Sequence, residues 1–364
     1  MEALKDPEPK VRAMAAESLG NFSRDGASAL DPLMERLSDE SIEVRRLAVL
    51  SLGRLGKGRP KVEDALKHIS SDPDPLIKLN ALVALATLGH MDESSIPILL
   101  EAINNKQEAT AKAAGIALTK VAVEKPDNVL PGLIELLDKK ENPGIINSLR
   151  ILTHMKNHAA PAVQKVAALY DGAKQPEKIE IVDTLSAIDT TGDYAIPVLM
   201  KALKEPDPLD REDALTMLMR YKSRADLFID GLLGALNDPE TKNRMLAVGI
   251  VRGLGQEPDK VVPQLVPLCA DPDLRVRSAA ISAISSFKKV PPSGVDAIEK
   301  SLNDADFRVR AAAATALARI SILDREKAFA ALQSALDKET NQQAKREILS
   351  ALNVMRRNTS QSTH

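Results

Sequence analysis

The stretch Asp271-Pro272-Asp273-Leu274-Arg275-Val276-Arg277 decides the fold, because most of the chain repeats it. A close copy begins 33 residues later at Asp304, and another begins 33 residues earlier at Asp238. A shifted eleventh copy begins near Asp337, and the remaining anchors are Asp6, Asp39, Asp72, Asn105, Asp138, Gly172 and Glu205. The spacing is 33 residues except for 34 between the fifth and sixth anchors. A fixed period of this length is typical of a solenoid of stacked helical hairpins.

Each copy predicts one amphipathic helix. With the anchor counted as position zero, positions five, nine and thirteen are mostly Val or Ile, then Ala, then Leu or Ile, as in Val44, Ala48 and Leu52. A spacing of four residues places these side chains on one helical face. The small residue at position nine allows a second helix to approach closely, with the larger residue at position thirteen filling the space beside it.

The start of this helix is predicted by its capping residues. Proline stands at position three in several copies, at Pro9, Pro75 and Pro208, and suits the first helical residue. Position two would then be the N-cap, where the sequence has Ser41, Asp74, Asp207, Asp273 and Asp306. Each such cap stabilises a helix by about 1 kcal/mol.

The Asp-Pro turn, the Val-Arg pair and the Ala-Ala run resemble the HEAT repeat, and more narrowly its short bacterial form found in the phycobilin lyases. The resemblance covers nearly the whole chain and implies an all-α solenoid of about eleven HEAT-like helical hairpins. It also implies that the Asp of each turn and the Arg after the Val tie neighbouring repeats together. That role falls here to Asp6, Asp39, Asp271 and Asp304 with Arg12, Arg45, Arg244, Arg277 and Arg310.

We therefore expect residues 1–357 to form a single elongated solenoid and residues 358–364 to form a disordered tail. Copies four to six, about 105–190, are degenerate, because position six holds Ala111, Gly144 and Lys178 instead of Arg. Either these copies have drifted while their neighbours hold them, or they form a functional bend or binding segment. The start, Met1 to Leu4, resembles a last helical turn, so the chain begins with a half repeat or is the end of a longer protein.

Composition restricts the function classes. Cys269 is the only cysteine, so a disulfide framework is excluded and a small buried hydrophobe is expected. Trp is absent and there are three Tyr and five Phe, which disfavours an aromatic platform for nucleic acid. No signal peptide and no run of 18 apolar residues is present, so we expect a soluble, cytoplasmic protein without a membrane span.

Catalytic and metal-binding patterns are weak. His154 and His158 are four residues apart and would share a helical face, but a zinc site needs further ligands. No glycine-rich phosphate loop and no Ser-His or Cys-His nucleophile pattern is found. The sequence therefore predicts a protein that is not an enzyme and that has no cofactor and no metal.

The predicted function is a scaffold or adaptor that binds a protein or peptide on the concave surface of its second helices. At positions seven, eleven and fourteen, opposite the core face, several copies carry apolar residues instead of polar ones. The predicted partner-binding residues are Leu79, Val83, Ile116, Leu149 and Leu152, flanked by Arg46 and Lys112. The competing interpretation is that the register slips and these side chains are core. Alternative functions are a bilin lyase-like chaperone of chromophore proteins, implied by the resemblance, and nucleic-acid binding.

Overall fold

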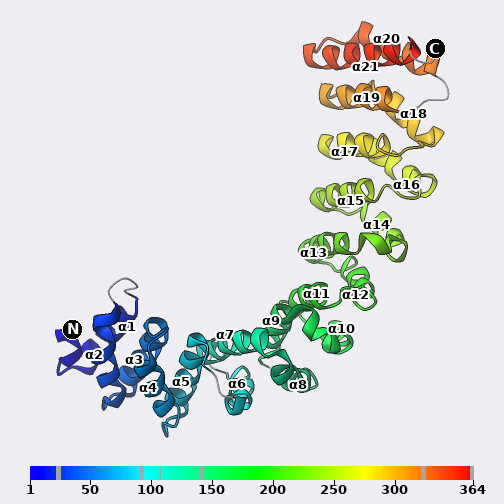
Figure 1. The fold of residues 1–364 in the computed structure, drawn as a ribbon. Coiled ribbons are helices and arrows are strands. Elements are labelled where there is room, and N and C mark those ends of the chain that lie inside the picture. Colours follow the sequence, from blue (N-terminus) through cyan, green and yellow to red (C-terminus); the bar gives the residue numbers. More distant parts are fainter. Residues whose placement is uncertain (22–25, 91–92, 107, 140–142, 321–324, 361–364) are drawn as a thin grey trace. The chain divides into compact units, whose positions relative to one another are not determined.

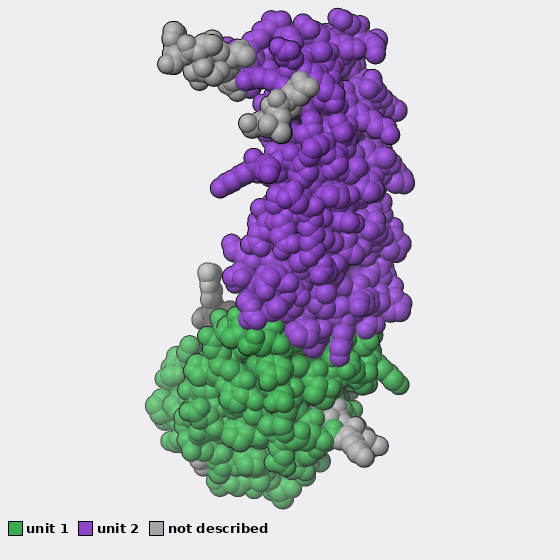
Figure 2. All heavy atoms as spheres, turned by 90° about the vertical axis from the view of Figure 1, so that its right-hand side faces the viewer, with its two compact units in different colours: residues 1–195 green, residues 196–364 purple. Residues whose placement is uncertain are grey.

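The computed structural model describes residues 1–21, 26–90, 93–106, 108–139, 143–320 and 325–360. Within these residues every regular element is an α-helix or a 3₁₀ helix, which confirms the all-α solenoid class. In the same residues, no helix combines the length and apolar character that crossing a membrane requires. The chain divides into two compact units, Met1–Ala195 and Ile196–His364, which Figure 2 colours separately. That the hairpins form one domain over 1–357 stays a prediction.

Unit 1 is a stack of hairpins in which one row holds the second helices and a parallel row holds the first helices (Figure 1). Its second helices are α1 (Pro9–Gly20), α3 (Ile42–Leu55), α5 (Pro75–Leu88), α7 (Glu108–Glu124), α9 (Ile145–Met155) and α11 (Glu177–Ile188). Its first helices are η1 (Glu2–Lys5), α2 (Leu30–Glu35), α4 (Pro60–Ile69), α6 (Ile96–Ala102), α8 (Pro126–Leu137) and α10 (Val163–Leu169). Short 3₁₀ segments flank three of them: η2 (Gly26–Ala29) and η3 (Arg36–Ser38) flank α2, η4 (Glu93–Ser95) precedes α6, and η5 (Lys156–Ala162) and η6 (Tyr170–Gly172) flank α10.

Unit 2 repeats the arrangement (Figure 1). Its second helices are α13 (Pro208–Leu218), α15 (Thr241–Leu254), α17 (Leu274–Ile284), α19 (Phe307–Arg319) and α21 (Gln342–Ser360). Its first helices are α12 (Ala195–Ala202), α14 (Ile229–Ala235), α16 (Pro258–Leu265), α18 (Pro292–Ser301) and α20 (Arg325–Lys338). Helix α12 begins at the unit boundary, η7 (Met219–Leu227) precedes α14, and η8 (Val266–Ala270) follows α16. Helix α21 continues to Ser360, three residues into the predicted tail, and residues 361–364 lie outside the described range.

The predicted caps form at four of five positions. The carboxylates of Asp74, Asp207, Asp273 and Asp306 accept hydrogen bonds from the first backbone N–H groups of α5, α13, α17 and α19. At Ser41 the prediction is wrong, since its side chain makes no capping hydrogen bond to α3.

The predicted core face is buried. Val44, Ala48 and Leu52 are fully buried, and so are the equivalent Ala residues of copies three, eight, nine and ten, which are Ala81, Ala247, Ala280 and Ala313. The first copy is the exception, because Val11 is 38% exposed. The first helix of that hairpin, η1, is a four-residue 3₁₀ turn, too short to cover the whole face of α1.

Glycine at position fourteen allows the closest approach between consecutive second helices. A Cβ added at Gly53 in α3 would lie 2.7 Å from the Cβ and 3.0 Å from the Cα of Ala84 in α5. A Cβ added at Gly20 in α1 would lie 2.2 Å from Oγ of Ser51 in α3. Real Cβ atoms do not come this close, so a larger residue at either position would push the stacked helices apart.

Two glycine-to-alanine variants test this packing. We expect Gly53→Ala to destabilise the protein by about 1–3 kcal/mol, because the added methyl overpacks the α3–α5 contact. Gly249→Ala is the matched control, since Gly249 lies inside α15 and an added Cβ would meet nothing within 4 Å. It should stabilise by about 0.5–1 kcal/mol through helix propensity alone. Urea unfolding measures both, and a stabilising effect of Gly53→Ala would contradict the packing account.

Candidate interaction surface

Arginines at position six join each turn to the next repeat. Nε and Nη2 of Arg277 donate to the two carboxylate oxygens of Asp304, at 2.8 and 2.9 Å. Its Nη1 donates to the carbonyl oxygens of Asp271 and Pro272, in the turn that precedes its own helix. One planar guanidinium thus fixes its own turn and the following one, which its fork of donors makes possible.

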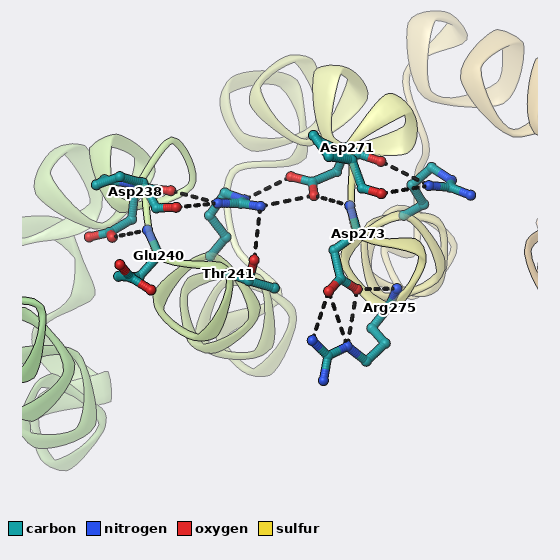
Figure 3. A network of polar contacts seen from close by, with 10 residues as sticks. Asp238, Glu240, Thr241, Asp271, Asp273 and Arg275 are labelled. Atoms are coloured by element: carbon teal, nitrogen blue, oxygen red, sulfur yellow. Dashed lines mark hydrogen bonds and ion pairs between the residues drawn. The ribbon is translucent and has the colours of Figure 1, made fainter.

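The same contact recurs in both units, and we call the set the arginine ladder. Its other bidentate pairs are Arg12–Asp39, Arg211–Asp238, Arg244–Asp271 and Arg310–Glu339. Figure 3 shows the carboxylates of Asp238 and Asp271 within this network. Arg45 is the weak member: its Nε lies 4.0 Å from Oδ2 of Asp72 and is buried without a hydrogen bond.

Each ladder carboxylate also closes its own turn. Oδ1 of Asp39 accepts the backbone N–H of Ser41 at 3.0 Å. Burial opposes ionisation of Asp39, but the hydrogen bonds from Arg12 and Ser41 outweigh it and hold its pKa below the ordinary value. Arg310 and two backbone N–H groups lower the pKa of Glu339 to about 2. The resulting stabilisation is present above the ordinary carboxyl pKa of about 4.3 and is lost as the pH falls towards 2.

The ladder confirms the tying role predicted for Asp39, Asp271 and Asp304. Asp6 takes part only through its own turn: its carboxylate accepts the N–H of Glu8, and its carbonyl oxygen accepts Nη1 of Arg12. Sequence reasoning missed Arg211, whose copy has Asp210 in place of the Val that marks the pair. Two acids were also missing from the predicted set: Asp238, which pairs with Arg211, and Glu339, which pairs with Arg310. Glu339 belongs to the shifted last copy, where a longer side chain reaches the arginine from a different position.

In copies four to six, shorter side chains replace the ladder. Oδ1 of Asn104 accepts the N–H of Gly144 at 3.2 Å, and a Cβ at Gly144 would lie 2.3 Å from the carbonyl oxygen of Ile103. Further along, the hydroxyls of Thr153 and Thr184 lie 3.0 Å apart and join α9 to α11. The missing arginine at position six is therefore compensated locally by close backbone approach and by hydroxyl contacts.

Four of the predicted partner-binding residues are buried, which corrects their expected exposure. Leu79 and Val83 are 6% and 8% exposed, because α5 packs against α3, α4, α6 and α7 and is covered nearly all round. Leu149 and Leu152 are fully buried, because the core face of α9 includes both of them together with Met155. The register of the upstream copies therefore places the solvent face of α9 wrongly. This agrees with the competing interpretation, in which the register slips and these side chains belong to the core.

The remaining predicted residues lie at the surface. Ile116 is 61% exposed and Lys112 is exposed, and Val123, which the sequence reasoning did not select, is 58% exposed. Arg46 on α3 is partly exposed and pairs with Glu43 at 2.7 Å. At 100° per residue, positions 112, 116, 119 and 123 fall within about 60° of one another. We call these four residues the α7 stripe.

The pattern of HEAT repeats matches residues 1–86, 62–153 and 289–353, and that of the HEAT repeat matches residues 261–290, more than half of the chain together. The chain belongs to the HEAT-repeat family. Neither match singles out the phycobilin-lyase type. No curated protein matches the sequence.

Solved structures share this HEAT-repeat fold at low identity. The karyopherin Kap121p, bound to the extreme C-terminus of the protein phosphatase Cdc14p, is 14% identical with a TM-score of 0.61, over 97% of this chain and 45% of that one. Kap95p in its complex with RanGDP is 14% identical with a TM-score of 0.56, over 97% and 56%. A homology model of the AP-3 complex is 13% identical with a TM-score of 0.64, over 97% and 73%. The HEAT-repeat chain thus spans about half the length of the karyopherin chains.

His154, His158 and Cys269 of this HEAT-repeat chain have local surroundings. Nδ1 of His154 lies 2.8 Å from the carbonyl oxygen of Arg150, one turn earlier on α9. His158 lies beyond the end of α9, in η5, so the two histidines do not share the helical face that was predicted. Burial raises the pKa of Cys269 to about 12, which keeps its thiol protonated and poorly nucleophilic at neutral pH.

Two arginines on α17 test the ladder against an ordinary surface pair. Arg277→Ala should destabilise the protein by about 1–3 kcal/mol, because the carboxylate of Asp304 loses both of its arginine donors and keeps the backbone N–H of Asp306. Arg275→Ala is the control: Arg275 is exposed and pairs at 2.7 Å with Asp273, the cap of its own helix, so no measurable change is expected. Urea unfolding distinguishes the two, and equal effects would contradict the ladder's role.

Proposed function

We propose that this chain is a non-enzymatic scaffold that binds a partner protein on the solvent face of its second helices, at the α7 stripe. The observation that carries the proposal is the exposure of Ile116 and Val123, at 61% and 58%, on one face of α7. Two large apolar side chains seven residues apart on one helix match the spacing at which a partner helix presents its own apolar anchors.

Charge next to the α7 stripe favours an acidic partner. Lys112 stands one turn before Ile116, and Lys120 lies near the C-terminal end of the same helix. Cations at the rim of an apolar contact orient an acidic partner and discriminate against basic ones. The proposed partner is therefore a protein segment with apolar residues flanked by Asp or Glu.

Neighbour contacts support the surface. Nζ of Lys120 donates to the carbonyl oxygen of Thr87 at the end of α5, and Nη1 of Arg54 donates to Oδ1 of Asn21, next to α1. In each contact the two partners are 33 residues apart in the sequence. Both contacts join consecutive second helices at their C-terminal ends, whereas the arginines of the ladder lie near the N-terminal ends of second helices. The contact from Lys120 holds the C-terminal end of α7 to α5, and a surface that is held in place before binding lowers the entropic cost of binding. Kap121p, which shares the fold, has been solved bound to a protein C-terminus.

The test is a pair of apolar-to-acidic variants. Ile116→Glu should abolish recovery of the partner in a pull-down followed by mass spectrometry, while helicity and melting temperature stay unchanged. Leu209→Glu, at an equally exposed residue of α13, is the matched control and should leave recovery unchanged. Equal recovery with wild type and Ile116→Glu would overturn the proposal, and a large drop in melting temperature would mean that Ile116 is structural.

A further inference from the structure

A surface cavity of about 640 Å³ lies in unit 1 between α5 and the first helices α4 and α6. Leu82, Leu85 and Ile98 contribute its apolar wall. Serines at the end of α4 and in η4, including Ser70 and Ser95, line it where larger side chains would fill the space. A cavity of this size is in the range that binds a small molecule or a few peptide side chains.

Basic side chains give this cavity its charge. Lys67, Lys78 and His90 line it, and its described lining includes no Asp or Glu. Two of these bases have a carboxylate beside them: Asp64 lies 3.8 Å from Nζ of Lys67, and Glu63 lies 3.0 Å from Nε2 of His90. Both Lys67 and Asp64 are exposed, so their pairing is weak.

Lys78 is the decisive residue, because it occupies position six, where the ladder copies carry arginine. In copies one, two and seven to ten this position reaches the acidic anchor of the next copy, but the anchor after copy three is Asn105. Lys78 is half-buried and forms no ion pair with any carboxylate in the described part of the chain. Its side chain instead lines the cavity. A half-buried ammonium without a counter-ion gains free energy when an anion reaches it.

We propose that this cavity, the edge pocket defined by Lys67, Lys78, His90, Leu82, Leu85 and Ile98, binds an acidic segment of a partner protein. A carboxylate of Asp or Glu pairs with Lys78 and Lys67, and a neighbouring apolar side chain packs on Leu82, Leu85 and Ile98. The pocket shares no residue with the α7 stripe, so it is a second binding site whose failure would leave the proposed function untouched.

The first experiment selects ligands without assuming a partner. A random twelve-residue peptide library displayed on phage is selected on the full chain, and the best peptide is synthesised with a fluorescent label. The proposal predicts peptides in which Asp or Glu stands within two residues of Leu, Ile or Phe. Enrichment of basic or purely apolar peptides, or no enrichment, would overturn it.

The second experiment places the peptide by fluorescence anisotropy. Lys78→Glu should weaken binding at least tenfold, and Lys67→Glu, at an exposed residue, should weaken it severalfold even where Lys78→Glu lowers stability. Lys61→Glu, on α4 but outside the pocket, is the matched charge control and should change binding less than twofold. An equal loss with Lys61→Glu, or loss only with Ile116→Glu, would overturn the assignment.

Competition distinguishes a carboxylate peptide from a phosphate group. Inorganic phosphate and chloride at matched ionic strength should displace the labelled peptide equally, because both only screen the charges. Selective displacement by inorganic phosphate at millimolar concentration would make phosphate the ligand and would contradict the proposed occupant.

Discussion

The bidentate contact between an arginine at position six and the acidic anchor of the next repeat is the interaction on which the stacking of the ladder copies depends. A solenoid has no central core, so each hairpin is stabilised only by its neighbours. Side chains of Arg211 and Asp238 are 10% and 4% exposed, and desolvation of this pair is offset by further hydrogen bonds to the turn carbonyls and to a backbone N–H. Such a pair sets register, because loss of one member leaves the other charge buried and unpaired.

Departures from the ladder coincide with the surfaces that we assign to binding. Copy three has Lys78 in place of arginine and opens a basic cavity beside α5. Copy four has Ala111 at the same position, and its helix α7 carries the exposed Ile116 and Val123. Copy three thus keeps a cation that makes no ladder pair, and copy four has an exposed apolar helix face without a ladder arginine. Both agree with the expectation that local rules are broken at functional sites.

The period and the core face could be predicted from the sequence, because each depends on residue types that recur at fixed positions, and the resemblance to HEAT repeats implied most of the ladder. Sequence reasoning failed where the answer depends on what surrounds a helix. Leu79 stands opposite the core face of its own hairpin, but four other helices enclose α5 and bury it. Leu149 follows a change of register in a degenerate copy. The edge pocket depends on small serines brought together from separate loops, and no spacing in the sequence indicates that cavity.

A double-mutant cycle on Arg211 and Asp238 tests the ladder most directly. Hydrogen exchange of the amides in α13 and α15 gives the opening free energy of the wild type, Arg211→Ala, Asp238→Ala and the double variant. The account predicts that the double variant loses at least about 1 kcal/mol less than the sum of the two single losses, because the two side chains stabilise the junction as a pair. Losses that simply add would contradict it.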